Sequence, residues 1–315
     1  MDLSFCIVNT NGRDHLGRCL EAIRDTVPAD LEFEVLVLDN ASEDGSAASV
    51  REWNEAESGL GDRLELIERE RRYGKAENDS LLLERSRGEF CLLLNEDTEL
   101  CPGAVGEFVA ALRADAQAAA AGGTLLDPGG NEAPSAWRLP GVGTSLIGAL
   151  FLHRLFVVQS GRGKGVRRVG WVQSAAMIVR RSAAAGVGYL DPAFFVYSDE
   201  TDFCKRLRDA DWEILYVPGA VAVHHEQLTN DPRHARPRAV EFHRNRDLYM
   251  RKHHGTAAAA IVRGLSAWAY GVRATLAVVR PGVDSGWMWL QAKLAWSPRG
   301  TGIRELAEEH NRDLS

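Results

Sequence analysis

Three polar side chains stand together at Asn95, Glu96 and Asp97, directly after the apolar run 91–94. This run is typical of a buried strand, so its polar end needs water, a hydrogen-bond donor or a cation, because an unpaired buried charge costs several kcal/mol or shifts its pKa. Two interpretations are open. The residues form a solvated loop or a cap for the helix expected after Pro102, or they bind a divalent cation, because Mg²⁺ and Mn²⁺ prefer oxygen ligands and often take only one or two carboxylates plus substrate phosphates.

A second acidic segment, DNASEDGS at 39–46, follows another apolar run. Acidic residues at the corresponding point of other mononucleotide-binding sheets accept hydrogen bonds from the nucleoside, which suggests a binding role for Asp39. Residues 44–46 equally suit a turn without further function.

Two later segments offer a base and further metal ligands. Residues 197–202 (YSDETD) place Asp199, Glu200 and Asp202 at an expected helix start, where they supply a general base with a second acid or simply favour the helix dipole. A strand expected at 213–225 ends on His224 and His225, which are either structural or complete a Mn²⁺ shell.

Strand and helix patterns alternate through the first third of the chain, which predicts an α/β fold with a mostly parallel central sheet flanked by helices. Strands are expected at 5–10, 33–40, 64–69 and 89–97, with helices near 16–27, 46–53, 75–87 and 104–114. The polar clusters at 9–14, 39–45 and 95–97 then fall at the carboxyl ends of strands, where such sheets bind ligands. One crevice is expected to collect them.

The remainder of the chain divides into an irregular part and a helical tail. Periodicity is lost from 127 to 168, and the basic, glycine-rich segment 160–168 is expected to be mobile. We predict a nucleotide-binding half at 1–126, an acceptor and base half at 127–254 of the same domain, and a helical C-terminal extension at 255–315.

Bulk composition limits the partners and the compartment. The net charge of −7 and the pI near 5.8 argue against nucleic acid as a partner. Five cysteines without a C-x-x-C pair predict free thiols in a reducing, cytoplasmic compartment, and no secretory signal is expected. The apolar region 256–279 is interrupted by Arg263 and Arg273, so it is not expected to span a membrane.

The same apolar tail leaves two interpretations open. In the first, its helices lie in a membrane interface with the arginines at anionic headgroups, which would make the protein peripheral on the inner face of a membrane. Alternatively they pack on the catalytic domain or on a second subunit in a homodimer, with the arginines exposed.

The clusters, in this order and spacing, resemble the family 2 glycosyltransferases of the GT-A fold, especially the bacterial branch that includes rhamnosyltransferases. The resemblance covers about residues 3 to 254 and is much more specific than any single motif. It is carried by IVNTNGRDHLGRCLEAI (7–23), VLVLDNASEDGS (35–46), RRYGKAENDSLLLERSRGEFCLLLNEDTEL (71–100), the segment 170–225 from GWVQSAAM to AVAVHH, and FHRNRDLYMRKHHG (242–255).

The resemblance implies a glycosyltransferase that moves a sugar, with inversion, from a nucleotide diphosphate donor such as dTDP-rhamnose to a hydroxyl of a glycan, lipid-linked or small-molecule acceptor. It implies that Asp39 contacts the nucleoside, that Asp97 binds Mn²⁺ or Mg²⁺ and the diphosphate, and that His224 or His225 contacts the metal or the phosphates. The base is Asp199 or Glu200.

Two departures from the family pattern affect these roles. The first acid of the family's D-x-D is Asn95, which leaves direct metal ligation to Asp97. The usual Glu-Asp order of the base pair is reversed at Asp199 and Glu200, so the choice between them is open.

Further residues are predicted to bind the substrates because they lie near these motifs. Each charged residue among them also suits a solvated surface, and Trp171 also suits plain packing. The predicted donor-site residues are Thr10, Asn11, Arg13, Asn40, Lys75, Asn78, Asn95, Glu96 and Arg246, with Arg244 as a further phosphate contact, and the predicted sugar-pocket residues are Trp171, Gln173 and Ser174.

A function from another class remains open, namely a non-catalytic nucleotide-sugar or glycan-binding protein with the same fold. A nucleotidyltransferase is disfavoured, because the chain has no glycine-rich, lysine-bearing phosphate loop near its start.

Overall fold

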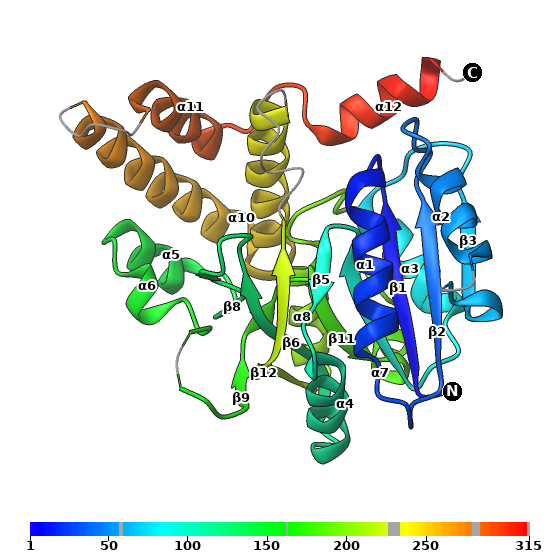
Figure 1. Ribbon diagram of the computed structural model, residues 1–315. Coiled ribbons are helices and arrows are strands. Elements are labelled where there is room, and N and C mark those ends of the chain that lie inside the picture. Colours follow the sequence, from blue (N-terminus) through cyan, green and yellow to red (C-terminus); the bar gives the residue numbers. More distant parts are fainter. Residues whose placement is uncertain (57–58, 162, 226–233, 279–283, 314–315) are drawn as a thin grey trace.

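The computed structural model describes residues 1–56, 59–161, 163–225, 234–278 and 284–313. A ten-stranded sheet runs through it in the order β3-β2-β1-β4-β11-β6-β12-β5, with β7 added beside β6 and β9 beside β12 (Figure 1). Its strands are β1 (Leu3–Asn9), β2 (Phe33–Asp39), β3 (Leu64–Glu68), β4 (Phe90–Asn95), β5 (Thr98–Leu100), β6 (Ala118–Leu126), β7 (Glu132–Ala133), β9 (Arg167–Val169), β11 (Ala176–Arg180) and β12 (Glu213–His224).

Helices cover both faces of this sheet, as the sequence predicts. The helices before the C-terminal region are α1 (Arg13–Thr26), α2 (Ser46–Glu55), α3 (Lys75–Arg85), α4 (Ala104–Ala114), α5 (Val142–Ala149), α6 (His153–Phe156), α7 (Arg181–Gly186) and α8 (Asp199–Asp209). A short 3-10 turn, Gly61–Arg63, precedes β3.

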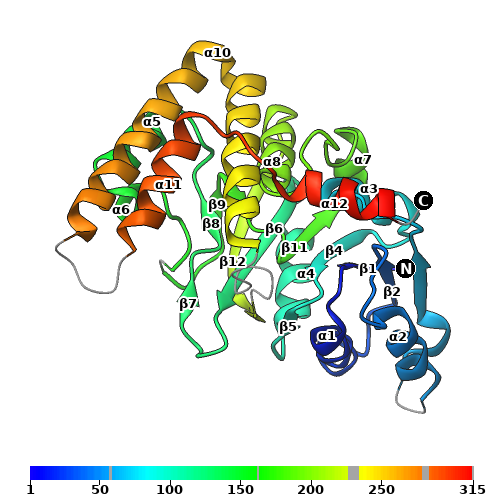
Figure 2. The ribbon, with the colours of Figure 1, turned by 90° about the horizontal axis from the view of Figure 1, so that it is seen from above.

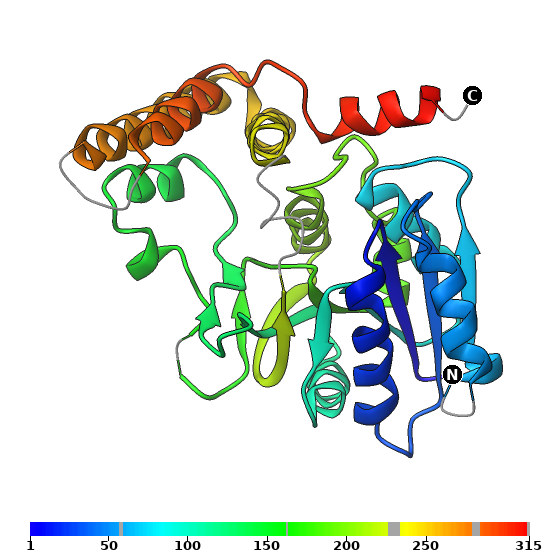
Figure 3. The ribbon, with the colours of Figure 1, turned by 45° about the horizontal axis from the view of Figure 1, so that its top comes forward.

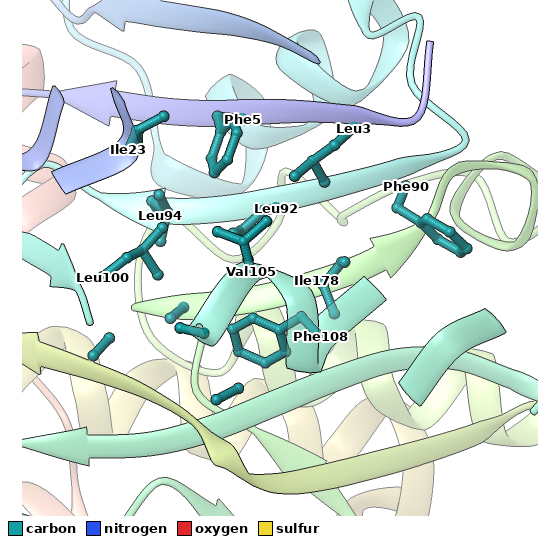
Figure 4. Packing of buried hydrophobic residues seen from close by; sticks show 14 of the residues in the cluster. Leu3, Phe5, Ile23, Phe90, Leu92, Leu94, Leu100, Val105, Phe108 and Ile178 are labelled. Atoms are coloured by element: carbon teal, nitrogen blue, oxygen red, sulfur yellow. The ribbon is translucent and has the colours of Figure 1, made fainter. Parts of the chain in front are cut away.

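Alternating side chains of the strands build two cores. Leu3, Phe5 and Ile7 of β1 point to one face and pack with α1 and α4, as Figure 4 shows for Phe5 beside Leu92. Cys6 and Val8 point to the other face, toward α3, α7 and α8. Every residue of β1 is therefore buried, as expected of a central parallel strand.

The predicted parallel arrangement holds for β3-β2-β1-β4, and the sheet is mixed beyond β4. Strand β11 runs antiparallel to both β4 and β6, while β12 returns parallel to β6. Strand β12 covers nearly the whole of the range expected from the sequence, because a register shift between Val217 and Val221 accommodates Pro218 and Gly219 as a bulge.

The segment expected to be irregular contains short elements, including α5 and α6. A two-stranded sheet of β8 (Ala136–Trp137) and β10 (Trp171–Val172) stacks the two tryptophan rings, with centroids 4.3 Å apart. Within the glycine-rich stretch expected to be mobile, residue 162 lies outside the described residues.

The C-terminal region begins with α10 (Ala235–Ala277), which bends at Gly255, where φ is 82° and ψ is 171°. After the bend α10 packs against α5 and against α11 (Ser285–Trp296). The last helix, α12 (Ile303–Asp313), then crosses back over the N-terminal half of the molecule (Figures 1, 2 and 3). None of the described helices is long and apolar enough to cross a membrane.

The five cysteines are free thiols, as predicted from their spacing. Four are buried and Cys101 is half-buried. Burial raises the pKa of Cys204 to about 12, so this thiol stays protonated and packs as an apolar group.

We expect Gly123→Ala to lower the free energy of unfolding by about 2 to 4 kcal/mol, because a Cβ there would overlap the backbone carbonyl oxygen of Ala220. Gly106→Ala is the matched control. Its Cβ would meet only Pro28 at 3.7 Å, and replacing a glycine in α4 favours the helix by up to about 1 kcal/mol. Urea unfolding of both variants measures the difference, and equal stabilities would contradict the packing of β6 on β12.

Candidate functional site

The register of three neighbouring strands brings their polar ends together. Asn9 of β1 pairs with Asp39 of β2, and Val8 of β1 pairs with Asn95 of β4. The three polar clusters after these strands therefore lie along one edge of the sheet, as the sequence predicts.

Asp39 is held by a hydrogen-bond network that centres on Asn9. The Asn9 side chain is fully buried and donates to Asp39 Oδ1 at 2.7 Å and to Ser42 Oγ at 3.1 Å. The backbone N–H of Ser42 donates to Asp39 Oδ2 at 3.0 Å. Both carboxylate oxygens thus have donors, so Asp39 is fixed in position while buried.

Asn40 ties the loops that follow β1 and β3. Its side chain donates to Thr10 Oγ1 at 3.2 Å and to the carbonyl oxygen of Tyr73 at 3.1 Å, and accepts from the Tyr73 N–H at 2.8 Å. Asn11 accepts a bond from the N–H of Glu43 at 2.8 Å. Asn40 and Asn11 therefore join three loops of the sheet edge directly.

Glu96 lies over the loop after β1. A Cβ added at Gly12 would come within 2.5 Å of Glu96 Cγ, so the glycine allows this close approach. Burial, followed by the charge of Asp97, raises the pKa of Glu96 to about 8, although Lys75 and the backbone of Thr10 act in the opposite sense. Glu96 is therefore largely protonated near neutral pH.

Asp97 and His224 meet at the ends of β4 and β12. His224 Nε2 lies 3.3 Å from Asp97 Oδ1 and 3.2 Å from the side-chain nitrogen of Asn95. Both Asp97 and His224 are less than a tenth exposed. The three side chains thus share one small space, although His224 lies far from Asn95 and Asp97 in the sequence.

The two neighbouring histidines differ in position. His225 Nε2 lies 2.7 Å from Glu99 Oε1, and its ring packs against His15 with centroids 5.1 Å apart. Successive side chains of a strand point to opposite sides, which explains the difference. His224 therefore joins Asp97, whereas His225 binds Glu99.

The Asp97 and His224 pair fits a divalent cation. Two ligands of one ion, each about 2.1 Å away and at right angles, stand about 3 Å apart, close to the 3.3 Å between Asp97 Oδ1 and His224 Nε2. Within the described ranges, no group of three or more His, Cys, Asp or Glu side chains is placed to hold a metal. Such a pair suits Mn²⁺ or Mg²⁺ completed by water and phosphate oxygens.

Lys75, the first residue of α3, connects this edge to the start of α8. Its ammonium group lies 2.6 Å from the buried carboxylate of Asp79. Burial lowers the pKa of Lys75, but the charges of Asp79, Asp199 and Glu200 outweigh this effect, and the pKa is raised. Lys75 is therefore a fixed positive charge among carboxylates.

Asp199 and Glu200 begin α8 in different environments. Asp199 is 1% exposed, its Oδ2 atom has no hydrogen-bond partner, and burial together with the charge of Glu200 raises its pKa well above the usual range. Glu200 is half-buried. The charged form of Asp199 is thus disfavoured, and Glu200 reaches solvent.

The backbone before α8 is strained. Tyr197 and Ser198 have φ values of 68° and 63°, a conformation that L-residues rarely adopt. Asn11 and Ala41, in the loops after β1 and β2, have φ values of 56° and 55°. Strained positions of this kind persist only where surrounding contacts hold them, and they cluster at functional sites.

Asp202 anchors α8 to the first half of α10. It is fully buried and binds Arg206 at 2.8 Å, with His253 Nε2 and Lys252 Nζ each at 2.7 Å. Asp202 therefore positions α8, the helix that carries Glu200. It does not serve as a second acid at the reacting centre.

Several predicted residues lie apart from this cluster. Arg246 lies 3.5 Å from Ser145 Oγ and lines a small cavity beside the second half of α10. Arg244 binds Glu305 at 2.7 Å, and the main-chain N–H of Arg13 donates to Asp44. The contacts of Arg244 and Arg246 are thus structural and do not connect them to the acidic cluster.

The predicted sugar-pocket residues and Asn78 are well packed. Trp171 stacks on Trp137, and its buried Nε1 has no hydrogen-bond partner. Ser174 is buried, and the N–H of Gln173 donates to the carbonyl oxygen of Ser135 at 3.1 Å. Asn78 is fully buried with an unpartnered Oδ1 atom.

Sequence reasoning placed Asn9 in the cluster 9–14 without giving it a role, and it missed Asp79 and Asn311. Asn9 and Asp79 left readable signals, a polar end on a buried strand and a Lys–Asp pair spaced i,i+4. Asn311 of α12 left none, although it exchanges hydrogen bonds of 2.7 and 2.8 Å with the main chain of Arg72, next to the Asn40 network.

Comparison with known proteins decides the family. The model of the family described as "Glycosyl transferase family 2" matches residues 4–168, more than half of the chain. The chain belongs to this family. It is therefore a glycosyltransferase, and the identification as a family 2, rhamnosyltransferase-like sequence is confirmed.

A curated relative and two solved structures agree with this result. An N-acetylglucosaminyl-diphospho-decaprenol L-rhamnosyltransferase of Mycobacterium tuberculosis is 28% identical over 229 residues, 67% of this chain and 72% of the relative. GalNAc-T7 with UDP, GalNAc and Mn²⁺ has a TM-score of 0.61 at 14% identity, covering all of this chain and 57% of the GalNAc-T7 chain. The mannosyltransferase PcManGT from Pyrobaculum calidifontis, with GDP-Man and Mn²⁺, has a TM-score of 0.60 at 17% identity, covering 99% of this chain and 85% of that one. The fold is GT-A, as predicted.

We expect Gly12→Ala to weaken binding of a nucleoside diphosphate with Mn²⁺ about tenfold, because the added Cβ displaces Glu96 and Asn9 from the sheet edge. Gly17→Ala is the matched control on α1, where a Cβ meets nothing within 4 Å. Titration calorimetry measures both affinities, after thermal unfolding shows that both variants fold. Equal binding by the two variants would contradict a donor site at the Gly12 loop.

Proposed function

We propose that this glycosyltransferase moves a sugar, with inversion, from a nucleotide diphosphate donor to an acceptor hydroxyl by metal-assisted direct displacement. The observation that carries the proposal is the Asp97–His224 pair at the same sheet edge as Asp39. In this arrangement Asp39 would bind the nucleoside, and a metal ion at Asp97 and His224 would neutralise the diphosphate. Transfer from a nucleotide sugar requires both functions.

Asp97 and His224 would hold Mn²⁺ or Mg²⁺. The bound ion supplies charge neutralisation of the diphosphate leaving group. Asp39, fixed by Asn9 and Ser42, accepts hydrogen bonds from the nucleoside, and the side chain of Asn95 lies beside the pair, 3.2 Å from His224 Nε2. Metal dependence is supported by the Mn²⁺ present with both solved relatives.

Glu200 is the general base in this proposal. The acceptor hydroxyl must be able to reach the base, which fits half-buried Glu200. It does not fit Asp199, which is 1% exposed and whose pKa is raised by burial. Asp199 precedes Glu200 in the first turn of α8, and the charges of both carboxylates contribute to the raised pKa of Lys75.

The name of the curated relative supports a donor and an acceptor class. That protein is named for transfer of L-rhamnose to a lipid-linked N-acetylglucosamine diphosphate. We propose dTDP-rhamnose as donor and a lipid-linked glycan as acceptor for this chain. Trp171, Gln173 and Ser174 would line the sugar pocket, with the unpartnered Trp171 Nε1 as a free donor.

The base assignment predicts different losses in two neighbouring variants. Glu200→Gln should lower kcat about 10² to 10⁴-fold with little change in donor KM, because proton removal is lost while binding remains. Asp199→Asn should cost much less, since an amide imitates a protonated carboxyl group in size and charge. Asp209→Asn, at the exposed end of α8, is the control with full activity. The reverse order of losses would assign the base to Asp199.

The metal assignment predicts that Asp97→Ala lowers turnover at least about 10²-fold and removes the response to Mn²⁺ and Mg²⁺. His225→Ala, whose ring binds Glu99 instead, should keep that response. Nucleoside diphosphate release from dTDP-, UDP- and GDP-sugars, with and without each metal, measures both. If the native protein binds a donor but turns over none of them under any metal condition, it is a non-catalytic binding protein.

A further inference from the structure

Exposed apolar side chains gather on one lobe of the molecule. We define the C-terminal lobe as residues 142–156, which contain α5 and α6, residues 256–278, which contain the second half of α10, and α11. Of the fifteen large hydrophobic side chains exposed among the described residues, twelve belong to this lobe. Trp268, Trp289 and Trp296 are 63%, 54% and 63% exposed. Single exposed apolar residues are ordinary, but a concentration of this kind marks an interaction surface.

The elements of the C-terminal lobe are packed together as one body. The second half of α10 contacts both α5 and α11, and Arg273 of α10 lies over the ring of Phe151, 5.0 Å from its centroid. Trp289 and Trp296 lie against α10 at Gly271 and Gly264, each within 4 Å of the position that a Cβ would occupy. Figures 1 and 3 show the lobe on the side of the molecule opposite α2 and β3. The tryptophans are thus held in place while remaining exposed.

Charge on and around the lobe has the opposite sign to the rest of the chain. The lobe carries four basic residues, Arg154, Arg263, Arg273 and Lys293, and no carboxylate, although the whole chain has a net charge of −7. On α11, Trp289, Lys293 and Trp296 are all exposed and follow the i, i+4, i+7 spacing of one helix face. This face combines aromatic and basic groups.

We infer that the C-terminal lobe docks on an anionic lipid surface. Tryptophan prefers the membrane–water interface, and each Lys or Arg near an anionic leaflet adds about 1 kcal/mol of attraction. Because none of the described helices can cross a bilayer, the lobe would lie on the surface. Association with a second copy is the competing occupant, but two lobes of the same positive sign repel each other.

The docked lobe is mechanically connected to the active site. The first half of α10, on the other side of the Gly255 bend, binds Asp202 through His253 and the carbonyl oxygen of Val196 through Asn245 at 2.7 Å. Docking would therefore hold the segment before Glu200 near the membrane surface. The lipid-binding inference itself rests on the exposed side chains and the charge, and does not depend on the proposed donor or acceptor.

Vesicle flotation of the full chain tests the inference. The protein should float with phosphatidylglycerol-containing vesicles and not with pure phosphatidylcholine vesicles, and raising NaCl from about 0.1 to about 0.5 M should weaken binding. Lys293→Gln should lower the partition coefficient about fivefold, and Trp289→Ser/Trp296→Ser should lower it further. Arg85→Gln is the control for charge, because it removes one exposed arginine outside the lobe.

Two results would overturn the inference. One is absence of flotation with anionic vesicles by native protein whose thermal unfolding shows it to be folded. The other is an equal loss of flotation in Arg85→Gln and Lys293→Gln, because equal losses would mean that overall charge, and not the lobe, attracts the protein to the vesicles. A dimer in light scattering that the Trp289→Ser/Trp296→Ser variant dissociates, without vesicle binding, would assign the lobe to a second copy. Turnover of a water-soluble acceptor by the variants checks the proposed function separately, because the lobe can fail as a lipid site while transfer persists.

Discussion

The structure depends on accommodating several carboxyl groups at one edge of a sheet. Asp39, Glu96, Asp97, Asp199 and Glu200 come from three segments, the end of β2, the turn after β4 and the start of α8, which the strand register or Lys75 brings together. Burial and their mutual repulsion raise the pKa of Glu96 and of Asp199, which disfavours the charged forms, and the ammonium group of Lys75 lies among them. Such a site accepts additional positive charge readily, since a cation lets buried carboxyl groups ionise. An acidic edge can therefore attract a negatively charged donor once a metal is bound.

The scaffold holds this edge by burying polar side chains with their partners. Asn9 is fully buried at the end of β1, yet its amide serves Asp39, Ser42 and the N–H of Gly12. The loops that it joins contain Asn11 and Ala41 in the left-handed conformation, which costs each residue about 1 kcal/mol or more. Fully buried strands on either side offset this cost, because their apolar contacts are independent of the loops. The loops are thus held in fixed shapes before a ligand arrives.

Sequence patterns predict the strand ends and the helix starts, but not the side of an element on which a residue acts. The patterns predicted a strand end at Asp39, a turn at Asp97 after a buried strand and a helix start at Asp199 and Glu200, and the structure has these elements there. His224 and His225 could not be separated, because successive strand residues face opposite sides and the orientation of β12 depends on its bulge. The pairing of Arg244 with Glu305 and the position of α12 over Arg72 depend on tertiary packing of the chain end, which leaves no local pattern.

Helix α10 connects the candidate site to the C-terminal lobe. Before Gly255 its side chains bind Asp202 and the loop that precedes α8, and α11 packs along both halves of α10, at His243 before the bend and at Gly264 and Gly271 after it. The positive φ of Gly255 allows a sharp change of direction that a residue with a Cβ rarely adopts. The angle between the lobe and the active site is therefore set by one backbone position and by packing on both sides of it. Ligands on a surface that binds the lobe would reach Glu200 in a fixed orientation, because α10 connects the lobe directly to α8, the helix that carries Glu200.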